Sequence, residues 1–290
     1  METVLQSRSS TVTIGPEQPF CIIGERINPT GRKTFAEALR NGDLSTVTAD
    51  AIAQTEAGAD MLDVNAGIPL VDEAELLATM LQTVQATVDA PICIDSSVIE
   101  ALEAGLAVYE GKALVNSVTG EDDRLEEILP LVARHGAAVI GLANDETGIP
   151  ETPQQRLEIA TKIVKVAGDY GIPPEDVVID PLAMTVGADT EAVTTTLEAI
   201  RLIREQLGVN MSLGASNVSF GLPDRHALNA GFLPMAMAAG LTSAIMSTAK
   251  VCVDSVGAAD LLLGHDPWGT RWIATHRARK AADAEAVAAT

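Results

Sequence analysis

The sequence predicts one α/β domain, a (β/α)8 TIM barrel, and three observations predict it. Eight short apolar runs alternate with stretches of helical periodicity along most of the chain. The runs are continuously apolar, as in parallel strands that are covered on both faces. The chain has 290 residues, 47% of them hydrophobic and only 3% aromatic, which suits one barrel of this kind. A doubly wound open sheet is the alternative, but no GxGxxG fingerprint follows the first strand.

The elements follow one another in a regular order. The first strand candidate, 20–24, runs into a loop over 25–31 that contains Pro29 and Gly31. The other strands are expected at 61–65, 91–95, 113–116, 137–143, 177–180, 211–215 and 244–246. Helices are expected at 34–40, 44–57, 73–87, 98–109, 123–135, 153–170, 191–207, 233–239 and 251–263.

This pattern divides the chain into three parts. Residues 1–19 are polar and are expected to form an irregular N-terminal lead-in. Residues 20–265 form the barrel, with no linker and no second domain. Residues 266–290 form a C-terminal tail whose Ala-rich end, from Lys280, is expected to be the frayed end of a helix.

Charge and cysteine content narrow the function classes. The net charge of −21 argues against nucleic acid or an anionic membrane as a partner. It favours either simple solubility or docking to a basic or cofactor-carrying protein. The three cysteines form no CxxC pair, so we expect no metal site. The first ten residues lack a signal-peptide core and no apolar run is long enough to span a bilayer, so we expect a cytoplasmic protein.

Polar side chains collect where the predicted strands end, which is where barrels of this class place their active sites. These ends supply Glu25, Arg26, Asn28, Asp63, Asn65, Asp95, Ser96, Asn116, Ser117, Asn144, Asp145, Asp180, Ser216 and Asn217. None is a histidine, which argues against a metal-dependent hydrolase. Carboxylates accept N–H bonds from a 2-aminopyrimidinone edge and amides both donate and accept, so the set favours a neutral heterocycle as ligand.

Each of these side chains also has a structural interpretation. Asp95 and Asp180 are suited to cap the helices that follow them. Asn116 is suited to a turn satisfied by backbone groups. For Asp63 and Asn65 we favour a structural network with Arg26. Polar ends at equivalent places in four βα units nevertheless favour one shared site.

At this point the residues resemble a known family, the pterin-binding methyltransferases that move a methyl group between methyltetrahydrofolate and a corrinoid. The resemblance covers roughly residues 20 to 265. It rests on Gly24-Glu25-Arg26-Ile27-Asn28, Leu62-Asp63-Val64-Asn65, Ile94-Asp95-Ser96, Val115-Asn116-Ser117, Gly141-Leu142, Thr147-Gly148-Ile149-Pro150, Ile179-Asp180-Pro181-Leu182, Ser216-Asn217-Val218-Ser219, Met235-Ala236-Met237-Ala238 and Leu241-Thr242-Ser243-Ala244-Ile245.

The resemblance implies a role for each site residue. The pterin edge would be held by Asp95, Asn116 and Asp180, with Gly214 and Ser216 alongside. The catalytic residue would be Asn217, which would hydrogen-bond N5, the nitrogen that carries the methyl group. The folate-tail candidates are Arg201, Phe220 and Arg225, and the supporting residues are Glu25, Arg26, Asn28, Asp63 and Asn65.

The resemblance also implies cofactors and partners. It implies tetrahydrofolate or methyltetrahydrofolate as one substrate, a corrinoid (cobalamin) carried by a partner protein as the other, and a homodimer. The loop Pro29-Thr30-Gly31-Arg32 favours transfer from methylcorrinoid to tetrahydrofolate, as in demethylation pathways. Two alternatives remain. One is a dihydropteroate synthase, although residues 25–30 read Glu-Arg-Ile-Asn-Pro-Thr instead of the synthase's Asn-Val-Thr-Pro-Asp-Ser-Phe. The other is a folate-presenting subunit without its own activity.

Overall fold

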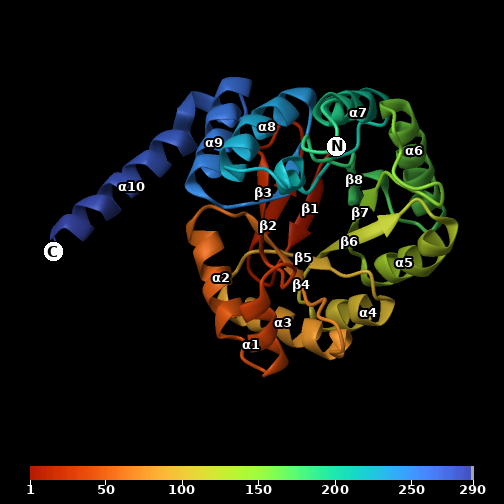
Figure 1. Cartoon of the computed structure of the whole chain (residues 1–290), viewed down its shortest axis with the longest axis horizontal. Coiled ribbons are helices and arrows are strands. Elements are labelled where there is room, and N and C mark those ends of the chain that lie inside the picture. The colour runs from red at the N-terminus through yellow and green to blue at the C-terminus, as the bar shows by residue number, and fades with distance from the viewer. Residues whose placement is uncertain (289–290) are drawn as a thin grey trace.

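The computed structural model describes residues 1–288, with side chains described through Ala281. Helices surround a ring of parallel strands, and the last helix extends away from that ring (Figure 1). The strands are β1 (Thr3–Gln6), β2 (Thr11–Ile14), β3 (Cys21–Ile27), β4 (Met61–Asn65), β5 (Ile92–Asp95), β6 (Leu114–Thr119), β7 (Ala138–Leu142), β8 (Val177–Asp180) and β9 (Ser243–Met246). The helices are α1 (Lys33–Arg40), α2 (Ser45–Glu56), α3 (Glu73–Thr87), α4 (Ile99–Val108), α5 (Asp122–His135), α6 (Pro153–Asp169), α7 (Ala192–Gln206), α8 (Arg225–Ala239), α9 (Lys250–Leu263) and α10 (Thr270–Ala288).

Seven strands pair in parallel in the order β8-β7-β6-β5-β4-β3-β9. The gap between β8 and β9 is closed by residues 210–214. Ile179 N donates to Asn210 O at 2.9 Å, Ser212 N donates to Ile179 O at 3.0 Å, and Ile245 N donates to Leu213 O at 2.9 Å. The predicted barrel is therefore confirmed, but its eighth strand is not a regular one. The chain enters a 3-10 helix (Ala215–Ser219) at once, so the segment is too short for a continuous ladder.

Two apolar layers hold the strands. Side chains on the outer face of the strands pack under the helices, and alternate side chains fill the barrel interior. The interior layer consists of Cys21, Ile23, Met61, Cys93, Leu114, Ala138, Ile140 and Val178, joined by Leu5 and Ile14. The three cysteines are free and buried, as expected of core residues.

The expectation of an irregular lead-in was wrong. β1 and β2 form an antiparallel hairpin, and its Leu5 and Ile14 are 0% exposed inside the barrel interior. Asn210 Nδ2 ties the hairpin down by donating to Thr3 Oγ1 and Ile14 O, both at 2.9 Å. The hairpin closes the end of the barrel where the strands begin, so the opposite end remains for a ligand.

Two other elements differ from the expectation. α8 begins at Arg225, eight residues earlier than expected; Pro234 lies inside this helix, and Asp224 begins it from a left-handed conformation. α10 begins at Thr270, far ahead of the Ala-rich end from Lys280; residues 289–290 of the expected tail lie outside the described residues. Within residues 1–288, no helix combines the length and apolar character needed to cross a bilayer.

Candidate active site

The barrel interior becomes polar toward the carboxyl ends of its strands. Side chains alternate along a strand, so residues two positions after an interior residue point the same way. By this spacing the interior positions Ile23, Met61, Cys93, Leu114 and Val178 lead to Glu25, Asp63, Asp95, Asn116 and Asp180. A layer of carboxyl and amide groups therefore lies on top of the apolar interior, at the end opposite the hairpin.

The centre of this layer is a row of three residues in register. Asn65 on β4 pairs with Asp95 on β5, which pairs with Asn116 on β6. Below them Asp63 is 2% exposed and accepts a hydrogen bond from Asn116 Nδ2 at 3.2 Å. Asn65 Nδ2 donates to Asp95 O at 3.3 Å. The structure thus brings together four residues that come from three predicted strand ends.

The favoured network of Asp63 and Asn65 with Arg26 was wrong. Arg26 is exposed, and within the described residues its side chain makes no hydrogen bond to either of them. The partners of Asp63 and Asn65 are the neighbouring strand ends themselves. Asn116 is accordingly not a turn residue satisfied by backbone, because its amide is used in the interior.

Two of these carboxyls share one environment. Burial first, and then the charge of Asp95, raises the pKa of Asp63 well above its usual range. Burial raises the pKa of Asp95 to about 6, against the hydrogen bonds from Asn65 and Asp63. The two carboxyls resist ionising together, and the charge of Asp95 disfavours the ionised form of Asp63. Asp95 is therefore the carboxyl of the pair that is better placed to offer a negative charge to a ligand.

Asp180 supplies the second carboxylate of the layer, from the end of β8. Its Oδ1 accepts a hydrogen bond from Leu182 N at 2.7 Å. Burial raises the pKa of Asp180 to about 7, against that hydrogen bond and the charge of Arg156. Neither Asp180 nor Asp95 caps a helix, since Glu191 begins α7 and Val98 begins α4. The capping interpretation of these two residues was wrong.

Asn217 lies in the 3-10 helix that follows the closing segment. Its side chain is exposed and makes no hydrogen bond within the described residues, so its amide is free for a ligand. The amide lies against Gly214, where an added Cβ would stand 3.0 Å from Asn217 Nδ2. Glycine at 214 therefore leaves the room that this amide occupies.

The neighbouring Ser216 links this 3-10 helix to the first strand. Its Oγ donates to Glu25 Oε1 at 2.9 Å and accepts from Asn229 Nδ2 at 3.2 Å. Burial raises the pKa of Glu25, against the hydrogen bond from Ser216 and the charge of Arg225. Asn229, 3% exposed on α8, was not predicted as a site residue, because nothing in its sequence context marks it.

The three folate-tail candidates lie in different places. Arg225 Nη2 donates to Ser216 O at 2.7 Å, and its guanidinium stands 5.6 Å from the centre of the Phe220 ring, which is 67% exposed. These two residues border the loop that carries Asn217. Arg201 instead pairs with Glu198 on the exposed face of α7, in its C-terminal half, so the structure does not bring Arg201 to the group.

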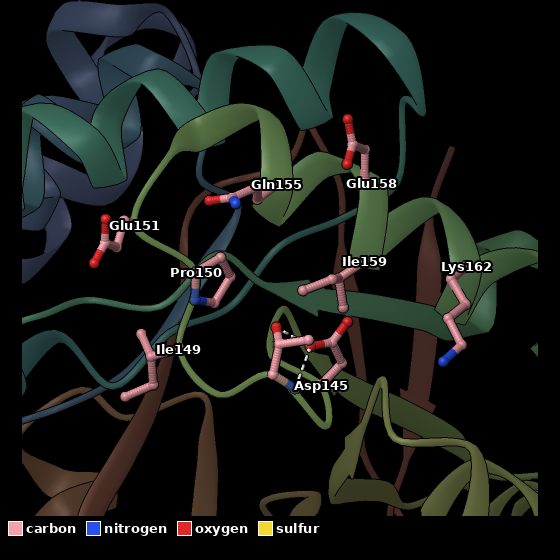
Figure 2. A pocket seen from close by; sticks show the side chains of 9 residues that line it. Asp145, Ile149, Pro150, Glu151, Gln155, Glu158, Ile159 and Lys162 are labelled. Carbon is pink, nitrogen blue, oxygen red and sulfur yellow. Dashed lines mark hydrogen bonds between the residues drawn. The ribbon is translucent and has the colours of Figure 1, made fainter.

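Asn28, which was predicted as a supporting residue, has a local role. Its Oδ1 accepts a hydrogen bond from Thr30 N at 2.9 Å and so shapes the loop after β3. The loop after β7, together with α6, borders a cavity of about 540 Å³ lined by Asp145, Thr147, Ile149 and Lys162 among others (Figure 2). A second cavity of about 640 Å³ lies between α9 and α10. No predicted pterin residue lines either cavity.

Comparisons with known proteins identify the family. The sequence model of the family described as pterin binding enzyme matches residues 24–247. A methylcorrinoid:tetrahydrofolate methyltransferase of Eubacterium limosum is 34% identical over 252 residues, which are 84% of this chain and 92% of the relative. A methionine synthase of Mycobacterium tuberculosis is 34% identical over 266 residues, 86% of this chain but only 22% of that much longer protein.

Solved structures support the fold. The dihydropteroate synthase of Yersinia pestis superposes with a TM-score of 0.66 at 13% identity, covering 90% of this chain and 99% of that one. The dihydropteroate synthase of Thermus thermophilus gives a TM-score of 0.64 at 20% identity, covering 89% of this chain and 99% of that one. At such identities the likeness establishes the barrel and nothing about the reaction. The chain belongs to the pterin-binding enzyme family, among its methyltetrahydrofolate:corrinoid methyltransferases.

Proposed function

We propose that the protein transfers a methyl group from a methylcorrinoid, carried by a partner protein, to N5 of tetrahydrofolate. The observation that carries this proposal is the layer of Asp95, Asn116 and Asp180, which lies at the same end of the barrel as the unpaired amide of Asn217. The Eubacterium limosum relative bears the name of this reaction, and that name supports the direction we propose.

The donors and acceptors of the layer fit a pterin edge. The 2-amino group and ring N–H of a 2-amino-4-oxopyrimidine are donors, and ionised Asp95 and Asp180 are acceptors. Asn116 supplies a free Oδ1, which can accept from the ring's donors, and a second N–H on Nδ2, which can donate to the ring's acceptors, because Nδ2 has one internal partner, Asp63. The buried carboxylates gain from this match, because a charged acceptor makes hydrogen bonds of about 1.5–3 kcal/mol.

The reaction forms one bond, breaks another and releases one proton. The N5–methyl bond forms, the cobalt–methyl bond breaks with its electron pair left on the cobalt, and N5 gives up its proton. The corrinoid substrate supplies the activated methyl group. Asn217 then orients N5 by a hydrogen bond that we expect to be strongest in the transition state. We assign the N5 proton to Glu25, directly or through water, because Ser216 holds this carboxyl beside Asn217.

Other features of the proposal follow from the resemblance. Phe220 and Arg225 border the path of the folate tail, whereas Arg201 is set aside because of its place on α7. The corrinoid arrives on a separate cytoplasmic protein, and the methyltransferase itself acts as a homodimer. Light scattering of the purified protein measures the mass of the assembly directly.

A visible spectrum tests the function. Purified protein is mixed anaerobically with methyltetrahydrofolate and photoreduced cob(I)alamin, the reverse of the proposed direction. We expect the Co(I) bands to be replaced by those of methylcobalamin. Folate binding without conversion would support a presenting subunit. Condensation of a pterin diphosphate with p-aminobenzoate would instead identify a dihydropteroate synthase. The absence of folate binding, together with the absence of both reactions, would refute the proposal.

The Asn217→Ala variant tests the catalytic assignment in the same assay. Loss of one preorganised hydrogen bond to a transition state costs about 2.7–4 kcal/mol, so the turnover should fall about 10²- to 10³-fold. Tetrahydrofolate should still bind within a few-fold of the parent, because the pterin edge keeps its contacts. A turnover within a few-fold of the parent would show that Asn217 does not act on N5.

A further inference from the structure

A buried arginine lies behind the end of β8. Arg156 is in the first turns of α6, and only 3% of it is exposed. Bringing a guanidinium out of water is costly unless hydrogen bonds and an opposite charge compensate it. Nothing in the sequence around Arg156, which lies in an otherwise ordinary helix, indicates that this arginine is buried.

All hydrogen bonds of Arg156 go to neutral oxygens. Its Nη1 donates to Pro181 O at 2.8 Å, Leu182 O at 2.7 Å and Thr196 Oγ1 at 3.3 Å, and its Nε donates to Pro150 O at 3.4 Å. Within the described residues no carboxylate forms an ion pair with it. The contact to Pro150 also ties the end of the β7–α6 loop, which Figure 2 shows leading into α6, to the loop after β8.

One peptide unit joins Arg156 to Asp180. The carbonyl of Pro181 accepts from Arg156, and the N–H of the same peptide, that of Leu182, donates to Asp180 Oδ1 at 2.7 Å. A cation at the carbonyl end of a peptide strengthens the donor at its other end. Leu182 itself has a φ of 65°, a conformation uncommon for leucine, and its carbonyl is held by both Arg156 and Thr196.

We propose that Arg156 is a positioning residue that fixes the orientation of Asp180 through the Pro181–Leu182 peptide and, by its positive charge, favours the carboxylate form that the pterin edge needs. This inference rests on the proposed function, because it deepens the role of Asp180 in ligand binding. Arg156 itself does not touch the ligand.

The charges around Asp180 support this assignment. The paired position on β7 is Leu142, the neighbouring closing segment contributes Met211 and Ser212, and α7 contributes the neutral Thr196. Within the described residues, Arg156 is the one charged group that acts on the pKa of Asp180, and it lowers that pKa against the effect of burial. Conversely, the charge of Asp180 offsets the loss of basicity that burial imposes on Arg156.

Two substitutions separate charge from hydrogen bonding. Arg156→Gln keeps a donor but removes the charge, whereas Arg156→Lys keeps the charge. Tetrahydrofolate affinity is measured calorimetrically from pH 6 to 9. In the parent we expect binding to weaken as the pH falls through about 7, where Asp180 takes up a proton. In Arg156→Gln this limb should move up by about one pH unit or more, which means binding weaker by about fivefold or more at pH 7 and little change at pH 9.

Two further variants serve as controls for the pH dependence. Arg156→Lys should keep the parent's pH limb, and Arg134→Gln, at an exposed arginine on α5, should match the parent throughout. An equal loss of affinity at every pH in Arg156→Gln, or no loss, would overturn the inference in favour of a purely structural role.

A second readout needs no ligand. The carboxyl ¹³C signal of Asp180, assigned by its absence in Asp180→Asn, reports the pKa of this group in the free protein. It should titrate near pH 7 in the parent and at higher pH in Arg156→Gln. If this shift occurs but the parent binds no folate, the inference about Arg156 and Asp180 stands and the proposed function fails. An unchanged titration would refute the inference alone.

Discussion

At the scale of single residues, the layer works because its carboxyls are held where ionisation is costly. Asp95 and Asp180 both have pKa values raised by burial, to about 6 and about 7. A ligand that donates N–H bonds removes this cost, so part of the binding energy comes from relief of an unfavourable site in the free protein. Stability and binding should therefore respond in opposite directions when such a carboxyl is replaced.

Asp95→Asn tests this opposition. A carboxyl whose native pKa lies above its unfolded value of 3.8 destabilises the fold at high pH, and the penalty disappears as the pH falls from about 7 to 4. At pH 8 the variant should be more stable than the parent by about 1–3 kcal/mol, and near pH 4 the gain should vanish. Pterin binding at pH 8 should weaken about tenfold or more.

Urea denaturation at both pH values and calorimetry with tetrahydrofolate measure the two effects. Asp123→Asn, at an exposed residue of α5, is the matched control and should change neither. A variant that is less stable than the parent at pH 8 would contradict the interpretation of Asp95 as a strained, ionised group.

The strand-end residues were predictable because parallel strands bring their carboxyl ends to one edge whatever the intervening helices do. Arg156 and Asn229 were not predictable, because each lies in a helix and its side chain meets a loop from another part of the chain. Helical periodicity shows which side of a helix is apolar, but it does not show that a loop carbonyl or a serine hydroxyl will meet an arginine or asparagine there. Arg26 was assigned to a network that it does not join for a different reason, because the sequence does not show which side chains of neighbouring strand ends meet, and this end of β3 leaves Arg26 exposed.

At the scale of elements, the N-terminal hairpin is part of the barrel's core. Thr3–Gln6 and Thr11–Ile14 are short and partly polar, so the sequence alone offered no reason to expect packing. Their role follows from the barrel, which offers an apolar interior that Leu5 and Ile14 cover at this end. Likewise residues 210–214 act as a strand only because β8 and β9 flank them.

Leu5→Ala tests the hairpin's contribution. Removing a fully buried leucine typically costs about 2–5 kcal/mol, so the urea midpoint should fall clearly. The adjacent Val4 is 37% exposed, and Val4→Ala should change the free energy of unfolding by no more than about 0.5 kcal/mol. Under conditions where both variants are folded, their methyl-transfer rates should equal that of the parent, since the hairpin and the polar layer lie at opposite ends. An equal effect of the two substitutions would show that the hairpin is not a core element.

At the scale of the whole molecule, the chain has a net charge of −21, but its last helix carries arginines that pair with acidic residues of the barrel. Arg271 and Arg279 of α10 pair with Asp60 and Asp254, respectively. The Trp272 ring packs close to Gly257, where an added Cβ would stand 3.5 Å from Trp272 Cε3. α10 is therefore fastened to the barrel through α9 and the loop between α2 and β4, while its far part extends away (Figure 1). The fold class was predictable from the alternation of elements, but this attachment was not, because it depends on long-range pairs.

The closing segment has a further consequence, which concerns motion. Residues 210–214 join β8 and β9 through only two backbone hydrogen bonds on each side, whereas β4 and β5 share an unbroken register. Local opening should therefore be easiest at this seam, and Asn217 follows it directly along the chain. We expect the amides of Ser212 and Ile245 to exchange with deuterium faster than that of Ile94. A pterin that bridges Asp180 and Asn217 should slow them, so the ligand would act as the missing part of the eighth strand.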